Sequence, residues 1–166
     1  MSARSTPGGQ RRGRQIAMSP AEVDRFLAEQ RVCRLASLGA RGPHVSPVWF
    51  VWVGGLLWIY SITRSQRWAD LEKDERVAGV VDAGDSYEEL RGVELRGRIE
   101  VVGEVPRTGV IDDPRLVEVE VAYARKYRGK GKVEHDGRHA WLVLVPKKLI
   151  SWDFRKLGTV GERPPR

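Results

Sequence analysis

The chain has 166 residues, a formal net charge of +7 and one cysteine, Cys33. This length predicts one domain with its own hydrophobic core, the charge favours an anionic partner, and the single cysteine excludes an internal disulfide. No apolar run reaches the about 18 residues of a membrane-spanning helix. The N-terminal residues lack the apolar segment of a signal peptide, so we expect a cytoplasmic protein in which Cys33 is a core residue.

The chain is expected to contain one folded unit between two tails. Residues 1–17 contain four arginines, a Pro-Gly-Gly sequence and no acidic residue, which is typical of a flexible basic tail. Residues 158–166 form the second expected tail, and residues 18–157 the domain.

The domain is predicted to begin with a helix at Ser19. Ser19 and Glu22 have the spacing of a capping box, and Pro20 occupies the first helical position. Apolar residues then recur at helical spacing. Strands are predicted after this helix at residues 32–38, 44–53 and 56–61, with a hairpin turn at Gly54-Gly55.

The second half alternates helices and strands. A short helix at 66–75 has Ser65 as its predicted cap, and strands follow at 77–82 and 91–105. In the latter strand Val93, Leu95, Gly97, Ile99 and Val101 share one face. Residues 113–128 fit either a strand or a helix, and Pro114 and Gly129 favour the helix. An Asp136-Gly137 hairpin turn, then strands at 138–146 and 150–154, complete the prediction.

Six or seven strands in hairpin order predict a mainly β protein, a closed or nearly closed antiparallel barrel. The second and third strands are apolar on both faces, so their outer face needs cover. Contact with a second molecule is the simplest cover, and a helix of the same chain is the alternative. The large residues concerned are Trp49, Phe50, Trp52 and Trp58.

Common catalytic motifs are absent from the sequence. No phosphate-binding loop, dinucleotide-binding glycine motif or nucleophile elbow is present. The histidines lack the spacing of metal ligands, so His44, His135 and His139 are interpreted as surface residues. Glu94 and Glu100 alternate with arginines, which indicates a charged strand face rather than a pair of catalytic carboxylates.

One stretch, Ser61 to Val77 (SITRSQRWADLEKDERV), combines hydroxyls and arginines at a helix start. Ser61 and Thr63 leave the predicted strand on the same side, and Arg67 falls in the first helical turn. Hydroxyls, backbone N–H groups and a guanidinium bind anions well at such a position. The alternative is a capped helix with a solvated arginine.

These features resemble the flavin-binding split-barrel proteins of the pyridoxamine 5'-phosphate oxidase family, and most closely the actinobacterial branch that uses the deazaflavin coenzyme F420. The resemblance runs from Ser19 to Gly158 through the capped helix, VCRLASL, HVSPVWFVWVGGLLWIYS, the stretch above and GVELRGRIEVVGE. The chain has Asp70 where the family often has Asn and Glu75 where it often has Pro. The resemblance implies a homodimeric split β-barrel with the cofactor site at the dimer interface.

The resemblance also implies a set of cofactor-binding residues. Ser61, Thr63 and Arg67 would contact the cofactor phosphate, with Trp68 beside them. Ser46, Pro47, Val48 and Trp49 would lie along the ring system. Trp58, Ile59, Tyr60 and Ile62 would supply strand backbone to the edge of the ring. The second subunit would contribute Trp152 and Arg155, or Tyr123 and Tyr127; Trp152 fits a core position equally well.

The implied function is transfer of a hydride from reduced F420 to a small conjugated or aromatic acceptor, with Tyr60 as a candidate proton donor. Basic residues at 126–132 (KYRGKGK) and in the N-terminal tail would suit the acidic oligoglutamate tail of F420; FMN is the alternative cofactor. A protein that carries a cofactor or binds haem without turnover is a second class. A small basic barrel that binds single-stranded nucleic acid through aromatic stacking is a third.

Overall fold

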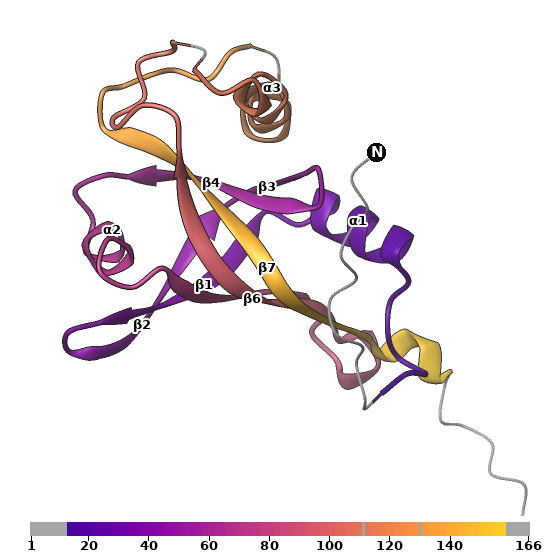
Figure 1. Cartoon of the computed structure of the whole chain (residues 1–166). Helices are drawn as coiled ribbons and strands as arrows, with labels where there is room; N and C mark the ends of the chain where they lie inside the picture. The colour runs from indigo at the N-terminus through magenta and orange to yellow at the C-terminus, as the bar shows by residue number, and fades with distance from the viewer. Residues whose placement is uncertain (1–12, 111, 130, 159–166) are drawn as a thin grey trace, which may run out of the picture.

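The computed structural model describes residues 13–110, 112–129 and 131–158; most of both predicted tails, at 1–12 and 159–166, lies outside them. The described part is mainly β, as predicted: seven antiparallel strands form one curled sheet, with three α-helices around it (Figure 1). In chain order the elements are α1 (Pro20–Glu29), β1 (Val32–Gly39), β2 (Gly42–Trp49), β3 (Val51–Val53), β4 (Leu56–Ile62), α2 (Gln66–Leu71), β5 (Arg76–Ala83), β6 (Arg91–Val102), α3 (Arg115–Arg128) and β7 (His139–Asp153), with 3₁₀ turns at Tyr87–Glu89 and Phe154–Leu157.

The sheet is curled, and its two edge strands are joined by the chain itself. The strand order is β2-β1-β5-β6-β7-β4-β3, so the edge strands β2 and β3 are also neighbours in the chain, joined only through Phe50. The predicted strand 44–53 is therefore two strands, which belong to opposite edges of the sheet. We call this junction at Phe50 the seam.

The seam is held by one side chain of α3. The backbone N–H of Phe50 donates to the hydroxyl oxygen of Tyr127 at 3.0 Å. The same oxygen lies 2.8 Å from the carbonyl of Phe50 and 2.7 Å from the carbonyl of Arg31. Phe50 does not pair with either neighbouring strand. The hydroxyl of Tyr127 supplies the hydrogen-bond partner that its backbone would otherwise lack.

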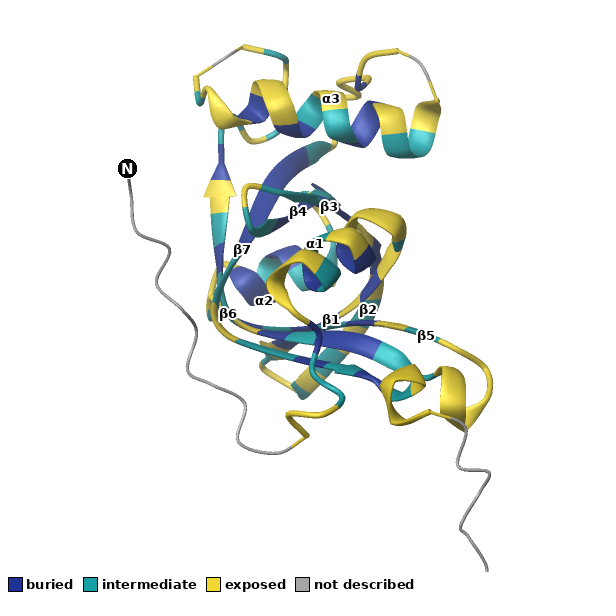
Figure 2. Cartoon of the chain, turned by 90° about the vertical axis from the view of Figure 1, so that its right-hand side faces the viewer, coloured by how far each residue is buried: buried dark blue, intermediate teal, exposed yellow. Residues whose placement is uncertain are grey.

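The first helix forms as predicted and covers an open end of the curled sheet. Ser19 Oγ accepts from the N–H of Glu22, whose carboxylate accepts from the N–H of Ser19, which completes the capping box. Its inward face carries Val23, Phe26 and Leu27, all buried (Figure 2). Cys33 is fully buried, as expected.

Helices of the same chain cover most of the apolar outer face of the second and third predicted strands. Trp58 is 2% exposed and packs in a buried cluster with α3. Trp52 donates to Asp24 of α1 at 2.7 Å, and Phe50 is fully buried. Contact with a second molecule is thus not needed for these three residues. Trp49, which is 52% exposed, is the exception.

The two strands predicted at 138–146 and 150–154 form one long strand, β7. Its pairing with β6 shifts register between Arg96 and Gly97, which pair with Lys148 and Pro146. A bulge at this point accommodates a proline that a regular ladder would exclude. Gly97 is required there, because a Cβ would lie 2.0 Å from the carbonyl oxygen of Val145.

Other predicted boundaries shift for local reasons. The helix predicted at 66–75 ends at Leu71, and the N–H of Arg76 donates to the Asp74 carboxylate at the start of β5. Val101, predicted to share the face of Ile99, is exposed, whereas Val102 is buried in the cluster that includes residues of α3. The Asp136-Gly137 pair is not a hairpin, since no strand precedes it in the described residues 131–138.

The third helix is confirmed and is attached by a buried polar network. Arg107 is 1% exposed, and its Nε donates to Glu120 of α3 while its Nη1 donates to Glu104, each at 2.7 Å. Trp141 of β7 also donates to Glu120, at 3.1 Å. A buried guanidinium with two carboxylates is compensated by charge and geometry, so the network fixes α3 over the end of the sheet. Within the described residues, no helix has the length and apolar character that crossing a membrane requires.

Replacing Tyr127 with phenylalanine tests the seam. The variant leaves the N–H and carbonyl of Phe50 without their partner, so we expect a loss of about 1–3 kcal/mol in the free energy of unfolding, measured by urea denaturation. Tyr87→Phe is the matched control, since Tyr87 is 66% exposed. Equal stability of both variants would contradict the role of the hydroxyl.

Candidate functional site

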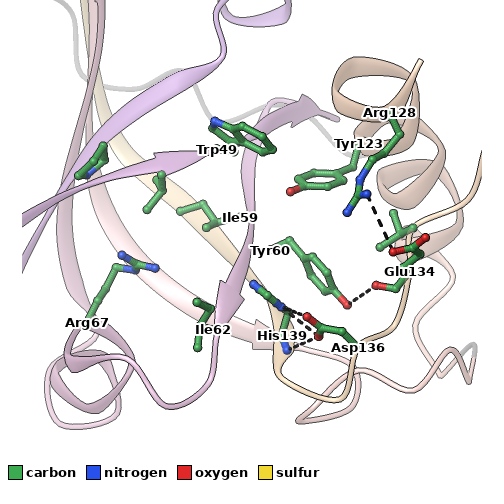
Figure 3. Close-up of a pocket in the computed structure, with 13 residues that line it drawn as sticks. Trp49, Ile59, Tyr60, Ile62, Arg67, Tyr123, Arg128, Glu134, Asp136 and His139 are labelled. Carbon is green, nitrogen blue, oxygen red and sulfur yellow. Dashed lines mark hydrogen bonds and ion pairs between the residues drawn. The ribbon is translucent and has the colours of Figure 1, made fainter. Parts of the chain in front are cut away.

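A cleft of about 400 Å³ lies beside the seam (Figure 3). Its walls come from β2, β4, α2, α3 and the segment that leads into β7. Seven of the residues nominated from the sequence line it, namely Pro47, Val48, Trp49, Ile59, Tyr60, Ile62 and Arg67. The region predicted to bind a cofactor therefore does form one concave site.

Arg67 lies at one end of the cleft between two serine hydroxyls. Its Nη1 donates to Ser46 Oγ at 2.7 Å and its Nη2 to Ser61 Oγ at 3.1 Å. Each hydroxyl accepts from the guanidinium and keeps its own hydrogen to donate to a further group. The Nε of Arg67 is buried and has no hydrogen-bond partner among the described residues. We call Arg67, Ser46 and Ser61 the arginine clamp.

The electrostatics of the arginine clamp favour an anion. Burial lowers the pKa of Arg67 from its usual value, because the charged form loses solvent. Both of these hydrogen bonds go to hydroxyl oxygens rather than to a carboxylate. Neutral hydroxyls do not compensate the charge of a guanidinium, and an anionic group in the cleft would supply the missing negative charge.

The middle of the cleft is apolar and partly aromatic. Val48 and Ile59 are buried in its wall, while Trp49 and Ile62 are about half exposed at its rim. The Trp49 ring stacks on Tyr127 with centroids 4.5 Å apart and planes at 6°. A flat apolar ligand would find both an aliphatic surface and a fixed aromatic edge here.

Tyr60 and Tyr123 form the aromatic wall at the other end. Their ring centroids lie 5.8 Å apart, and Tyr60 also packs against Trp141 at 4.8 Å. Burial raises the pKa of the Tyr60 phenol to about 12. Tyr123, predicted as one possible contribution from a second subunit, lines the cleft of its own chain.

His139 is a site residue that sequence analysis missed, because it was interpreted as a surface histidine. It begins β7, lines the cleft and stacks on Tyr60 with centroids 4.9 Å apart. Its Nδ1 lies 2.8 Å from Oδ2 of Asp136. The spacing of Asp136 and His139 in the sequence could have indicated the pair. These residues form a turn in which the Asp136 carboxylate accepts from the backbone N–H groups of Arg138 and His139.

The basic segment at 126–132 only partly faces solvent. Lys126 is turned inward: its Nζ lies 4.3 Å from the Phe50 ring centroid and donates to the carbonyl of Leu27. Burial lowers the pKa of Lys126 to about 8. Arg128 lies at the cleft and pairs loosely with Glu134 at 4.0 Å. Residue 130 lies outside the described residues.

Five nominated residues of the same region do not line the cleft, and two of them, Ser46 and Ser61, are connected to it only through Arg67. Trp58 lies under α3 and donates to the carbonyl of Val53. Thr63 turns toward β7, where its N–H and Oγ1 both donate to the carbonyl of Arg138. Trp68 is 5% exposed in the barrel core, because α2 packs that face against the sheet.

Trp152 and Arg155 lie at or beyond the far end of β7, away from the cleft of their own chain. Trp152 packs on Gly92, where a Cβ would lie 2.3 Å from the indole ring. Arg155 forms an ion pair with Asp153 at 2.6 Å. Their contribution to a site in a second subunit stays a prediction. Across the described ranges, no group of three or more His, Cys, Asp and Glu side chains could hold a metal ion.

Comparison with known proteins identifies relatives of this arrangement. The family model described as pyridoxamine 5'-phosphate oxidase matches residues 19–153. No curated protein sequence matches the chain.

Solved structures share the fold. A conserved hypothetical protein of Mycobacterium tuberculosis, Rv2991, is 28% identical with a TM-score of 0.77, over 95% of this chain and 98% of that one. A FAD-binding protein of Mesorhizobium loti is 18% identical with a TM-score of 0.63, over 81% and 93%. A structure titled F420 reductase is 22% identical with a TM-score of 0.57, over 76% and 94%.

The raised pKa of Tyr60 gives a test of its burial. The folded chain holds this proton more tightly than the unfolded chain, where the pKa is about 10, so stability is lost as pH rises from about 10 to 12. An alkaline titration of tyrosinate absorbance should show that Tyr60→Phe removes a group that ionises near pH 12. If the ionisation that disappears in Tyr60→Phe has its midpoint near pH 10 instead, the buried position of Tyr60 is contradicted.

Proposed function

The chain belongs to the pyridoxamine 5'-phosphate oxidase family, and from that premise we propose that it binds coenzyme F420 in the cleft and reduces a small conjugated or aromatic acceptor. The bound cofactor would supply the hydride, while the chain holds the cofactor, orients it and limits the access of water. The observation that carries the proposal is the arginine clamp: a half-buried guanidinium that lines the cleft and is held by two serine hydroxyls rather than by a carboxylate.

Each part of the cleft suits one part of such a cofactor. The arginine clamp would hold a phosphate, since guanidinium and hydroxyl donors match phosphate oxygens. Val48, Trp49 and Ile59 would lie along a flat ring system. A volume of about 400 Å³ suits a ring system rather than a whole cofactor, so the remainder would extend over the surface.

The preference for F420 over FMN rests on surface charge near the cleft. Arg125, Arg128 and Lys132 are exposed on α3 and just after it, where they could attract an oligoglutamate tail. Lys126 is excluded from this role because it is turned toward Phe50. The FMN alternative needs only the arginine clamp and the apolar wall, and the FAD-binding structural relative supports a flavin in this fold.

We propose further that the chain is a homodimer with the cleft at the interface. The outward side of β2 exposes Val45, Pro47 and Trp49, with Val45 at 61% and Trp49 at 52%. Pro47 and Trp49 line the cleft, and β2 is an edge strand of the sheet. A second copy would bury this surface and could bring Trp152 and Arg155 to the cleft.

Two further classes remain as alternatives. A carrier or haem-binding protein without turnover would use the same cleft, and reduction of an acceptor separates it from an enzyme. Binding of single-stranded nucleic acid is weakly supported, because only Trp49 of the tryptophans at 49, 52, 58 and 68 is substantially exposed.

Arg67→Ala tests the arginine clamp directly. We expect this variant to weaken binding of F420, and of FMN if it binds, by about 1.5–3 kcal/mol, the scale of a hydrogen bond to a charged group. Fluorescence titration of purified, cofactor-free protein at two salt concentrations measures the dissociation constants. Arg64→Ala is the matched control, since Arg64 is exposed three residues earlier and should change binding little.

The same titration decides between the cofactors. Tight F420 binding with weak FMN binding would support the deazaflavin proposal, and the reverse would support FMN. Binding that is unchanged in Arg67→Ala would remove the arginine clamp from the site. Failure of the wild-type chain to bind either cofactor would refute the proposed function, and an oligonucleotide titration at the same two salt concentrations would follow.

A further inference from the structure

We propose that His139, oriented by Asp136, is the proton donor to the acceptor. This inference rests on the proposed function and goes beyond it. It assigns the protonation of the acceptor, which accompanies hydride transfer, to a residue outside the arginine clamp. The carrying observation is geometric: an imidazole and a carboxylate form a pair at the end of the cleft that the arginine clamp does not occupy (Figure 3).

The tautomer of His139 follows from its partner. Nδ1 lies 2.8 Å and 3.0 Å from the two carboxylate oxygens of Asp136. The hydrogen bond to His139 lowers the pKa of Asp136 well below its usual range, so the carboxyl is ionised and can only accept. Nδ1 therefore carries hydrogen, and Nε2 is the nitrogen that exchanges a proton.

The position of His139 is fixed from several sides. Asp136 is held by backbone N–H groups of Arg138 and His139 at 2.9 and 3.2 Å. The backbone carbonyl of His139 accepts from the N–H of Arg107, the residue of the buried network under α3. Tyr60 stacks on the ring at an angle of 24°. A donor held in this way needs little reorganisation during the reaction.

Exposure and surroundings are compatible with proton transfer. The His139 side chain is 24% exposed, so solvent can return a proton after each turnover. The charged and titratable groups of the cleft come from every element around it: Asp136 and Glu134 before β7, Tyr60 on β4, Tyr123 and Arg128 on α3, and Arg67 on α2. Asp136 and Tyr60 are the groups in direct contact with the ring.

Tyr60 is the other candidate donor in this wall. Its phenol has a pKa of about 12 and lies 3.4 Å from the carbonyl oxygen of Glu134. At neutral pH an imidazolium gives up its proton far more readily than such a phenol. The structure therefore assigns the proton to His139 and a positioning role to Tyr60.

The proposed step balances. A conjugated acceptor gains a hydride, with its electron pair, on one atom from a reduced deazaflavin or flavin. Its neighbouring atom gains a proton from Nε2–H of His139. The double bond of the acceptor is reduced, the cofactor is oxidised, the imidazolium becomes a neutral imidazole with hydrogen on Nδ1, and solvent reprotonates it.

Two variants on the same segment test the assignment. His139→Gln removes the donor, and His135→Gln is the control, since His135 faces Glu120 at 3.3 Å and does not line the cleft. The probe acceptor is 2-cyclohexen-1-one, whose reduction needs a proton on carbon. Binding of F420 and FMN, and oxidation of the bound reduced cofactor by the enone, are measured from about pH 5 to 8.

We expect His135→Gln to bind cofactor as the wild type does, and all rates are compared at saturating cofactor. Wild type and His135→Gln should reduce the enone at similar rates. His139→Gln should be slower by roughly 100-fold or more. Unchanged turnover in His139→Gln would overturn the proposal, as would a cofactor-bound wild type that leaves the enone unreduced.

A measurement without cofactor separates this proposal from the proposed function. Nitrogen NMR of the isotope-labelled, cofactor-free chain should show hydrogen on Nδ1 of His139, and Asp136→Ala should abolish that preference. Hydrogen on Nε2 alone in the neutral ring would overturn the orientation, whatever cofactor the chain binds. Absence of cofactor binding with the expected tautomer would refute the proposed function and the donor role, yet leave the His139–Asp136 pair established.

Discussion

The arrangement of the site depends on one hydroxyl group. Tyr127 reaches from α3 to the seam and satisfies the backbone of Phe50, where the chain leaves one edge of the sheet and joins the other. Because the same side chain stacks on Trp49, the closure of the barrel and the rim of the cleft are fixed together. Tyr123, one helical turn earlier, then has a fixed place opposite Tyr60.

Local patterns predicted the elements well where one interaction decides them. Ser19 and Glu22 define a helix start by their own hydrogen bonds, and the spacing from Ser61 to Arg67 was enough to bring a guanidinium back over a strand end. The division of the strand at Phe50 was not predictable, because its cause is Tyr127, which lies 77 positions later in the chain. Pro146 similarly suggested a strand end, where pairing with β6 absorbs it in a bulge.

The site was predictable in part for the same reason. Residues of β2, β4 and α2 could be nominated because they lie close together in sequence and flank one hairpin. His139 was missed because its role depends on β7 pairing with β4, which places it opposite Ile62 and beside Tyr60. Thr63 has the expected parity, yet the continued pairing toward Arg138 turns its hydroxyl away.

The buried network around Arg107 joins the wall containing His139 to α3 and the preceding loop. Arg107 bonds to Glu104 and Glu120 through its side chain and to His139 through its backbone. The opposite wall, with the arginine clamp, belongs to the barrel itself. The two ends of the cleft are thus anchored separately: α3 and the loop before it hold the end that contains His139, whereas the sheet and α2 hold the end that contains Arg67.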